Sequence, residues 1–212
     1  MIQKEKLSRK QRDRLRHRDE ILAAALGLFS ERGYHNVSMQ EVAETAEFSV
    51  GTLYNLFESK EALLDELMAS NTQKIIAAIL GILDGPGDAA KRLRILFRRQ
   101  PELMEEHGAF IKLHFAEVGP YAAGHAHTGA AKDEFRIVLD TRLSQLIASG
   151  VEKHLFRDVD PMITAKAIHA FMESMAFEIA GRFDKEAVVE MFAKAEQLFF
   201  DGLLLPGGPE NG

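Results

Sequence analysis

Hydrophobic positions recur at helical spacing along almost the whole chain. Apolar residues three or four positions apart share one face of an α-helix, whereas alternation with a period of two is typical of a strand. The helical spacing dominates from residue 16 onward, and no convincing run alternates with period two. The pattern therefore predicts an all-α fold.

Residues that cap or break helices separate these apolar stripes. Ser59, Asp88 and Asp160 stand at predicted N-caps, and Gly33 and Gly150 follow predicted C-terminal ends. A proline at position 101 is expected to restart or kink the chain, and a glycine at 108 to break it again. The predicted helices span about residues 16–32, 38–46, 50–57, 59–83, 88–100, 101–118, 132–149, 161–180 and 185–204.

Two of the short helices stand directly behind the first long one and are joined by a tight turn. Ser38 and Glu41 fit the S-x-x-E capping box at the start of the first short helix. In the second, Leu53 and Phe57 share an apolar face four residues apart, while Gly, Thr, Tyr and Asn point elsewhere. A second helix of this kind suits docking into a DNA major groove. The pattern predicts a helix-turn-helix.

These residues resemble the TetR family of one-component transcriptional regulators. The resemblance covers roughly the first third of the chain and depends on many positions at fixed spacing. It is carried by residues 21–25, Leu28, Phe29, Gly33, Tyr34, Ser38, Met39, Val42, Ala43, Ala46, Ser49, residues 51–54, Phe57 and residues 59–64. Leu56 departs from the family, which often has an aromatic residue or a histidine beside the phosphate backbone there, so Leu56 is expected to pack.

The resemblance implies both an organisation and a function. It implies a basic arm and helix-turn-helix domain over residues 1–62, a helical effector-binding and dimerisation domain over 63–205, and a disordered tail over 206–212. It also implies a ligand-responsive regulator, most often a repressor, that binds a palindromic double-stranded DNA operator as a homodimer. A small, apolar effector is expected to release it.

The expected DNA contacts combine phosphate binding at capped helix starts with base contacts from the second short helix. For Ser38 the alternative is a cap without a DNA contact, and for Tyr54 it is an aromatic side chain that braces the turn. The role of Asn55 is the least defined. The expected set is Ser38, Ser49, Val50, Gly51, Thr52, Tyr54, Asn55 and Lys60.

The charge of the chain is distributed unevenly. The first 18 residues carry a net charge of +6, whereas the whole chain carries −6. A basic arm on an acidic body is the pattern expected where one end contacts nucleic acid. The alternatives are a solubilising tail or a helix at a membrane surface, although the arm lacks the apolar face that such a helix needs. Whether the first helix already begins near Ser8 stays open.

Composition excludes several classes of site. The 212 residues include no cysteine, so no disulfide or cysteine-based zinc site can form, and no apolar run reaches about 18 residues. The N-terminus has no secretory signal, and a cytoplasmic protein is expected. An all-helical enzyme or ligand carrier is the rival function. Against an enzyme, no nucleophile–base arrangement, phosphate loop or cofactor fingerprint is present, and no cofactor is expected.

The resemblance places an effector pocket and a dimer interface in the second half of the chain. The candidate pocket residues, for which plain core is the alternative, are Phe110, His114, Phe115, Phe135, His169 and Met172. The candidate interface residues, for which intrachain core is the alternative, are Met175, Ile179, Met191, Leu198 and Phe199. The His125–His127 pair and the His169–Glu173 pair could hold a metal, but no tight metal-binding spacing supports this, and no metal is expected.

Overall fold

The fold is seen in a computed structural model that describes residues 8–118, 129–181 and 183–203, without the side chains of Val118 and of residues 129–135. The described chain is helical, with no strand, which confirms the predicted all-α class. The elements are α1 (Arg9–Arg32), the 3-10 turn η1 (Tyr34–Asn36), α2 (Met39–Thr45), α3 (Val50–Leu56), α4 (Lys60–Leu83), α5 (Ala89–Glu106), α6 (Gly108–Val118), α7 (Gly129–Glu152), α8 (Pro161–Ala180) and α9 (Lys185–Leu203).

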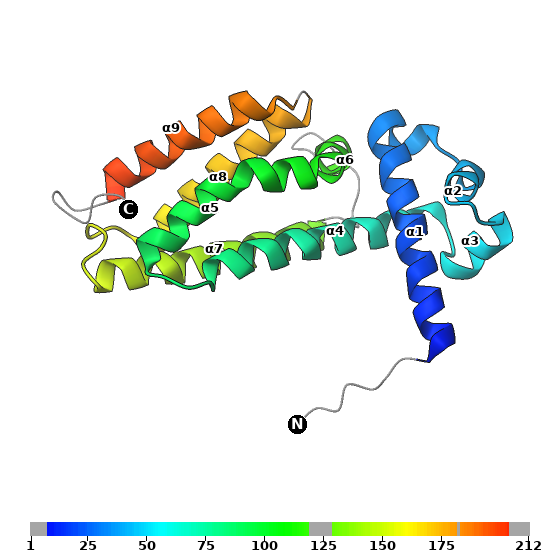
Figure 1. The fold of residues 1–212 in the computed structure, drawn as a ribbon, viewed down its shortest axis with the longest axis horizontal. Coiled ribbons are helices and arrows are strands. Elements are labelled where there is room, and N and C mark those ends of the chain that lie inside the picture. The colour runs from blue at the N-terminus through cyan, green and yellow to red at the C-terminus, as the bar shows by residue number, and fades with distance from the viewer. Residues whose placement is uncertain (1–7, 119–128, 182, 204–212) are drawn as a thin grey trace.

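The helices form two groups that share α4. In Figure 1, α1, α2 and α3 gather at one end of the molecule, and α4 leads from that end into the layer formed with α5, α7, α8 and α9. Helix α6 packs against α1, so the second group contacts the first at a place far from α4 in the sequence. Two connections therefore join the groups, one covalent and one through packing.

The N-terminal group has its own hydrophobic core. Ile21, Ala25 and Phe29 of α1 meet Leu53 of α3 in a cluster of fully buried side chains. The cluster extends past residue 62 to Leu63, Leu67 and Met68 of α4, and it takes in Phe110 and Leu113 of α6. A domain boundary at residue 62 stays a prediction, and the core of the first group crosses it.

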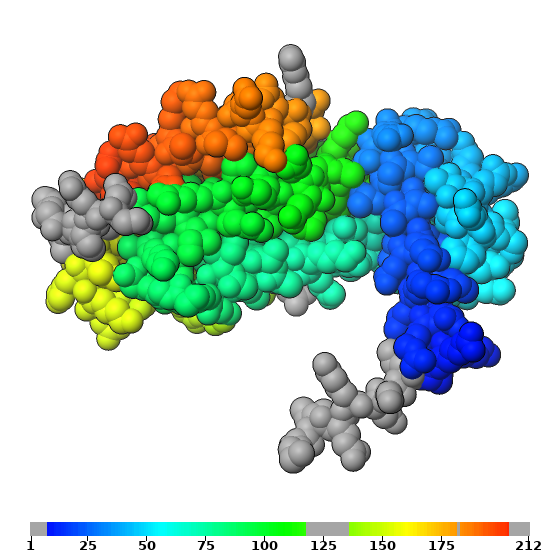
Figure 2. Space-filling view, in the orientation of Figure 1, coloured from blue at the N-terminus to red at the C-terminus, as the bar shows by residue number. Residues whose placement is uncertain are grey.

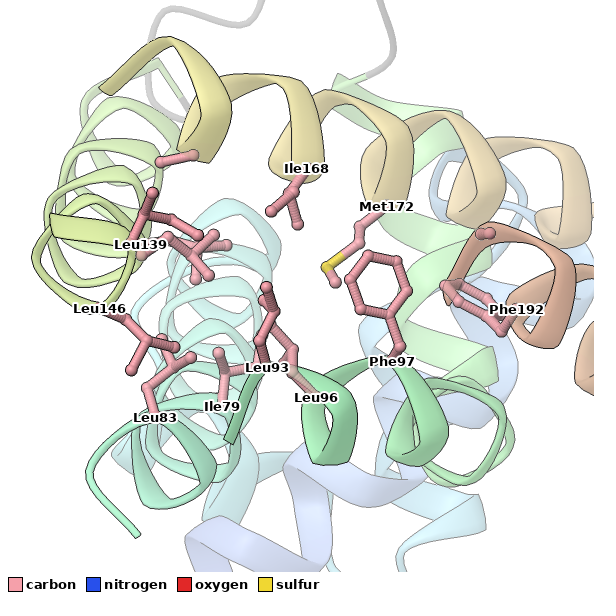
Figure 3. Close-up of a cluster of buried hydrophobic side chains, with 14 of the residues drawn as sticks. Ile79, Leu83, Leu93, Leu96, Phe97, Leu139, Leu146, Ile168, Met172 and Phe192 are labelled. Carbon is pink, nitrogen blue, oxygen red and sulfur yellow. The ribbon is translucent and has the colours of Figure 1, made fainter. Parts of the chain in front are cut away.

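The second core lies between the long helices. Figure 3 shows buried side chains of α4, α5, α7, α8 and α9 converging on one volume. The labelled members are Ile79, Leu83, Leu93, Leu96, Phe97, Leu139, Leu146, Ile168, Met172 and Phe192. A buried carboxylate adds a polar tie between α5 and α9, because Glu196 accepts hydrogen bonds from Arg94 (3.1 Å) and Arg98 (3.0 Å). Helix α9 is thereby held to α5 by both apolar packing and charge.

The structure settles one helix end that the sequence left open and corrects two others. Helix α1 begins at Arg9, because Ser8 and Gln11 form a capping box. Helix α5 continues through Pro101, whose side chain is buried, so tertiary packing outweighs the loss of one backbone hydrogen bond. The predicted loop over 119–129 and tail over 206–212 lie outside the described residues, apart from Gly129, which begins α7.

Gly150 does not end α7 as predicted. The helix starts at Gly129 and runs through Gly150 to Glu152. A Cβ atom built on Gly150 would lie 2.1 Å from Cδ2 of Phe156, a buried ring of the second core. The glycine is therefore required by packing, because only a residue without a side chain lets the ring approach the helix backbone.

Candidate DNA-binding surface and effector cavity

The start of α2 is a complete capping box, as predicted. Ser38 Oγ accepts a hydrogen bond from the Glu41 backbone N–H (3.2 Å), and Glu41 Oε2 accepts one from the Ser38 backbone N–H (2.8 Å). The Ser38 hydroxyl also donates to the Glu41 carboxylate (2.8 Å). Ser38 is exposed, but its hydroxyl proton is engaged within the cap. A phosphate would have to compete with Glu41 for it.

Stability at acid pH should depend on this cap. The backbone N–H of Ser38, then its hydroxyl and Arg32, lower the pKa of Glu41 from 4.5 to about 2. A lowered pKa stabilises the folded state fully above pH 4.5, and this contribution is lost as the pH falls toward 2. We expect Glu41→Gln to make the urea midpoint, followed by circular dichroism, depend less steeply on pH between 5 and 2. Glu44→Gln, which removes a carboxylate of the same helix outside the cap, is the control, and an equal change of slope in both variants would contradict the role of the cap.

Helix α3 offers an exposed face with a buried one behind it. Its cap is Ser49, whose Oγ accepts from the Thr52 backbone N–H (3.1 Å) and shares a hydrogen bond with the Thr52 hydroxyl (2.9 Å). Leu53 is fully buried, whereas Tyr54 is 52% exposed. The predicted contact residues Val50, Gly51, Tyr54 and Asn55 are all exposed, and Thr52 is half-buried.

Gly51 has no packing role inside the protein. A Cβ atom built there would meet only Ser49 Oγ, at 3.8 Å, which is an ordinary contact. Gly150 by contrast is required by the core. The absence of a side chain at position 51 therefore affects only what approaches α3 from outside.

Lys60 lies at the start of α4 and is half-buried. Its Nζ is 4.2 Å from the centroid of the Tyr34 ring and 5.9 Å from that of Phe29, in the geometry of a cation–π contact. Lys60, which is predicted to contact phosphate, thus packs within the fold as well. Lys60 helps to join α4 to η1 and α1.

Arg18, the last residue of the predicted basic arm, faces inward. Its Nε donates to Glu66 Oε1 of α4 (2.7 Å), and its Nη1 donates to the backbone carbonyl of Leu56 at the end of α3 (2.9 Å). The guanidinium carbon also lies 4.6 Å above the Phe57 ring. Arg18 therefore ties α1, α3 and α4 together. Leu56 is half-buried and packs on the N-terminal core, as expected.

The other arginines and lysines of α1 remain outside. Arg9, Lys10, Arg12, Arg14 and Arg16 are exposed on the first turns of the helix. In Figure 2 this end of α1 projects beyond the body of the molecule. A helix, rather than an extended arm, thus carries most of the described positive charge of the N-terminus.

A cavity of about 390 Å³ lies between α4, α5, α6, α7 and α8. This volume falls within the range of small-molecule sites. Five predicted pocket residues line it: Phe110, His114, Phe115, His169 and Met172. The side chain of Phe135, the sixth, lies outside the described part of the chain. Most of the remaining lining is apolar, with Met68, Ile75, Ile79, Leu103, Met104, Ile111, Leu139 and Ala176.

The polar groups of the cavity were largely missed by sequence reasoning. His169 was expected, but its partner is Asp140 of α7, whose Oδ1 lies 2.6 Å from His169 Nδ1. Gln100 of α5 is 6% exposed and lines the cavity. Its signal was present, because it follows Leu93, Leu96 and Phe97 at helical spacing and is a polar residue at an apolar position.

No group of three or more His, Asp or Glu side chains in the described chain is arranged to hold a metal ion. His125 and His127 lie outside the described residues. Glu173 lines the cavity with His169, which is engaged with Asp140. None of the described helices is long and apolar enough to cross a membrane.

The predicted interface residues separate into two kinds. Leu198 is 70% exposed, whereas Met175, Ile179, Met191 and Phe199 are partly buried and pack against the second core. The other exposed apolar side chains of α8 and α9, chiefly Ile163, Phe177 and Val189, were not among the predicted residues. An exposed position cannot be told from a buried one on a helix that is apolar over much of its surface.

Known proteins match both halves of this arrangement. Residues 21–67 match the family model described as bacterial regulatory proteins, tetR family. The curated HTH-type transcriptional repressor KstR2 of Mycobacterium tuberculosis is 29% identical over 152 residues, which are 68% of this chain and 72% of that protein. The matched residues of this chain contain α2, α3 and the start of α4.

Two solved structures share the fold of the whole described chain. The ketosteroid transcriptional regulator KstR2 of Mycobacterium tuberculosis has a TM-score of 0.68 at 22% identity, covering 89% of this chain and 95% of that one. The transcriptional regulator FadR of Bacillus subtilis, in complex with stearoyl-CoA, has a TM-score of 0.70 at 16% identity, covering 87% and 98%. At these identities the likeness shows the fold.

Proposed function

We propose, because this chain belongs to the tetR family of bacterial regulatory proteins, that it is a repressor released from DNA by a small molecule. The repressor binds a palindromic operator as a homodimer in the cytoplasm, and a mostly apolar effector in the cavity between α4 and α8 lowers its affinity. The observation that carries this proposal is the capped helix α3, with exposed polar residues over a buried leucine.

The exposed face of α3 supports major-groove binding. Gly51 allows close approach, while Thr52, Tyr54 and Asn55 supply a methyl group, hydroxyls and an amide for phosphates and base edges. Ser38 and Ser49 place the N-termini of α2 and α3 where phosphates can meet backbone N–H groups. The exposed basic residues of α1 add affinity that does not depend on DNA sequence.

Helices α4 and α6 provide a path from the cavity to α3. The first turns of α4 lie in the N-terminal core, and its middle turns line the cavity with Met68, Ile75 and Ile79. Phe110 of α6 belongs to that core and to the cavity wall at once. An effector that moves either helix thus also moves part of the N-terminal core that supports α3. A free-energy difference of a few kcal/mol between two packings of these helices is enough to switch the protein between them.

Two observations support an effector with a large apolar part. The lining of the cavity is mostly apolar, and the solved relatives include a ketosteroid regulator and a regulator in complex with stearoyl-CoA. For this chain we infer from these two relatives only that the effector is a lipid-like molecule.

The homodimer is proposed from the apolar surface of α8 and α9. Ile163 is 69% exposed, Leu198 70% and Phe177 53%. Large apolar side chains exposed on neighbouring helices are typical of protein interfaces. A twofold dimer would also place two copies of α3 on the two halves of a palindromic site, about 34–36 Å apart.

The proposal is tested by fluorescence anisotropy with DNA from the region flanking the protein's own gene, at two salt concentrations. Tight binding that needs a palindrome and weakens steeply with salt is expected, because released counterions drive phosphate contacts. Equal affinity for random DNA at both salt concentrations would contradict the proposal.

Gly51→Leu should separate stability from DNA binding. The position is exposed and open, and leucine favours a helix more than glycine by roughly 0.5–1 kcal/mol, so the unfolding midpoint should stay or rise. Operator affinity should fall at least about tenfold, because a new side chain on α3 would hold the helix away from the groove. Thermal unfolding and the anisotropy titration measure the two effects. An unchanged operator affinity would contradict the proposal that α3 binds in the major groove.

A further inference from the structure

Gln100 is a buried polar side chain that lines the cavity. It is 6% exposed, and its Nε2 has no hydrogen-bond partner among the described residues. A buried amide N–H without a partner costs free energy, so most such groups in folded proteins are satisfied. A turn of the amide about its terminal bond would bring Nε2 to the cavity surface, where a bound molecule with an accepting oxygen would satisfy it. A leucine would fill the same place on an apolar helix face at no such cost.

The charges around the cavity argue against a charged ligand. Of the described lining residues, the single lysine or arginine is Arg136, and its side chain is exposed. Burial lowers the pKa of His107 and favours its neutral form, and His169 is engaged with Asp140. The third lining histidine, His114, packs its ring against Phe110 and Phe115. A carboxylate in the enclosed part would thus lose its hydration without gaining a buried cation, which is strongly unfavourable.

The positions of the lining carboxylates do not favour a cationic ligand either. The lining carboxylates are Asp65, which is exposed, and Glu173, which lies on α8 one turn from His169. Neither is at the position of Gln100 on α5. A cation bound to them would leave the Gln100 amide donor without an acceptor.

We propose, building on the proposed effector function, that the effector is an uncharged, mostly apolar molecule with a carbonyl oxygen that accepts a hydrogen bond from Gln100 Nε2. A ketone or an ester supplies such an oxygen without adding a donor that would itself need a buried partner. The apolar remainder lies against the methionine and isoleucine side chains of α4, α5 and α6. Gln100 selects for the carbonyl, and the apolar walls supply most of the affinity.

The test is displacement of the neutral dye Nile red from the full-length protein. The competitors share a ten-carbon chain and differ in their polar group: decan-2-one, decanoate and decylamine. A second set uses decalin with a ketone, a carboxylate or an amine. We expect a ketone to displace the dye at a concentration at least about tenfold lower than its charged counterparts.

Gln100→Leu should weaken ketone binding about fivefold, since a neutral hydrogen bond is lost. Gln100→Met, which keeps the length of the side chain, is a second variant should leucine disturb the packing. Gln73→Leu makes the same chemical change at an exposed position of α4 and should leave the ketone affinity unchanged. Thermal unfolding of each variant confirms that the fold is retained.

Three outcomes would overturn the proposal: a carboxylate or an amine that binds as tightly as the ketone, ketone affinity that neither Gln100 variant changes, or no displacement by either ketone. The readout requires no DNA. Gln100-dependent ketone binding without operator binding would therefore contradict only the proposed repressor function. Release of the operator by decanoate but not by a ketone would contradict only the inference.

Discussion

Gly150→Ala is expected to destabilise the protein by about 3 kcal/mol, near the upper end for an overpacked core. The new Cβ would lie 2.1 Å from one carbon of the Phe156 ring and 2.3 Å from another. Phe156 is 2% exposed, so the ring cannot move outward without opening the second core. Urea unfolding followed by circular dichroism measures the loss.

Gly81→Ala is the matched control, because it makes the same change within another long helix. Gly81 lies in α4, is exposed, and has nothing within 4 Å of the position of a Cβ atom. Alanine favours the helix over glycine by up to about 1 kcal/mol, so this variant should be slightly more stable than the natural protein. If both variants behaved alike, the close packing of Phe156 on α7 would be wrong.

The double variant Ile163→Glu/Leu198→Glu is expected to be monomeric and to lose at least about 100-fold in operator affinity. In a twofold interface each substitution introduces two like charges into an apolar contact, and the buried charges would be unpaired. Separate α3 helices would then lose the gain that comes from binding two half-sites at once. Native mass spectrometry and anisotropy measure the two losses.

The fold of the monomer should survive this change. The two side chains are 69% and 70% exposed, so replacing them opens no cavity. Ile137→Glu is the control, since Ile137 is a comparably exposed apolar residue (61%) on α7. A double variant that remained dimeric, or an Ile137 variant that became monomeric, would contradict the proposed interface.

The helix-turn-helix could be predicted from the sequence because its signals are local. The capping box of Ser38 and Glu41 and the spacing of Leu53 and Phe57 each depend on residues within one or two helical turns. The prediction that these elements form, and that Leu53 and Phe57 are buried, was confirmed. The resemblance to the TetR family, also confirmed, depends on the same short stretch.

The limits of the long helices were predicted less well where local and tertiary preferences disagree. At Pro101 the local preference is to break the helix, and at Gly150 it is to end it, yet both residues lie within helices. Burial of Pro101 and the approach of Phe156 to Gly150 decide these positions. Neither contact can be seen in the spacing of residues along the chain.

The candidate sites also combine features that the local sequence sets with features that tertiary packing sets. The sequence by itself determined the helical class, the N-caps from Ser38 onward that it predicted, and which side of α3 is apolar, because these follow from backbone hydrogen bonding and helical periodicity. Only the tertiary structure decided that Arg18 ties α1 to α3 and α4, that Gln100 lines the cavity, that Asp140 contacts His169, and that Ile163 and Leu198 are exposed. The reason is that these properties depend on which helices become neighbours, and residues from 29 to 48 positions apart meet in the Asp140–His169 and Arg18–Glu66 contacts.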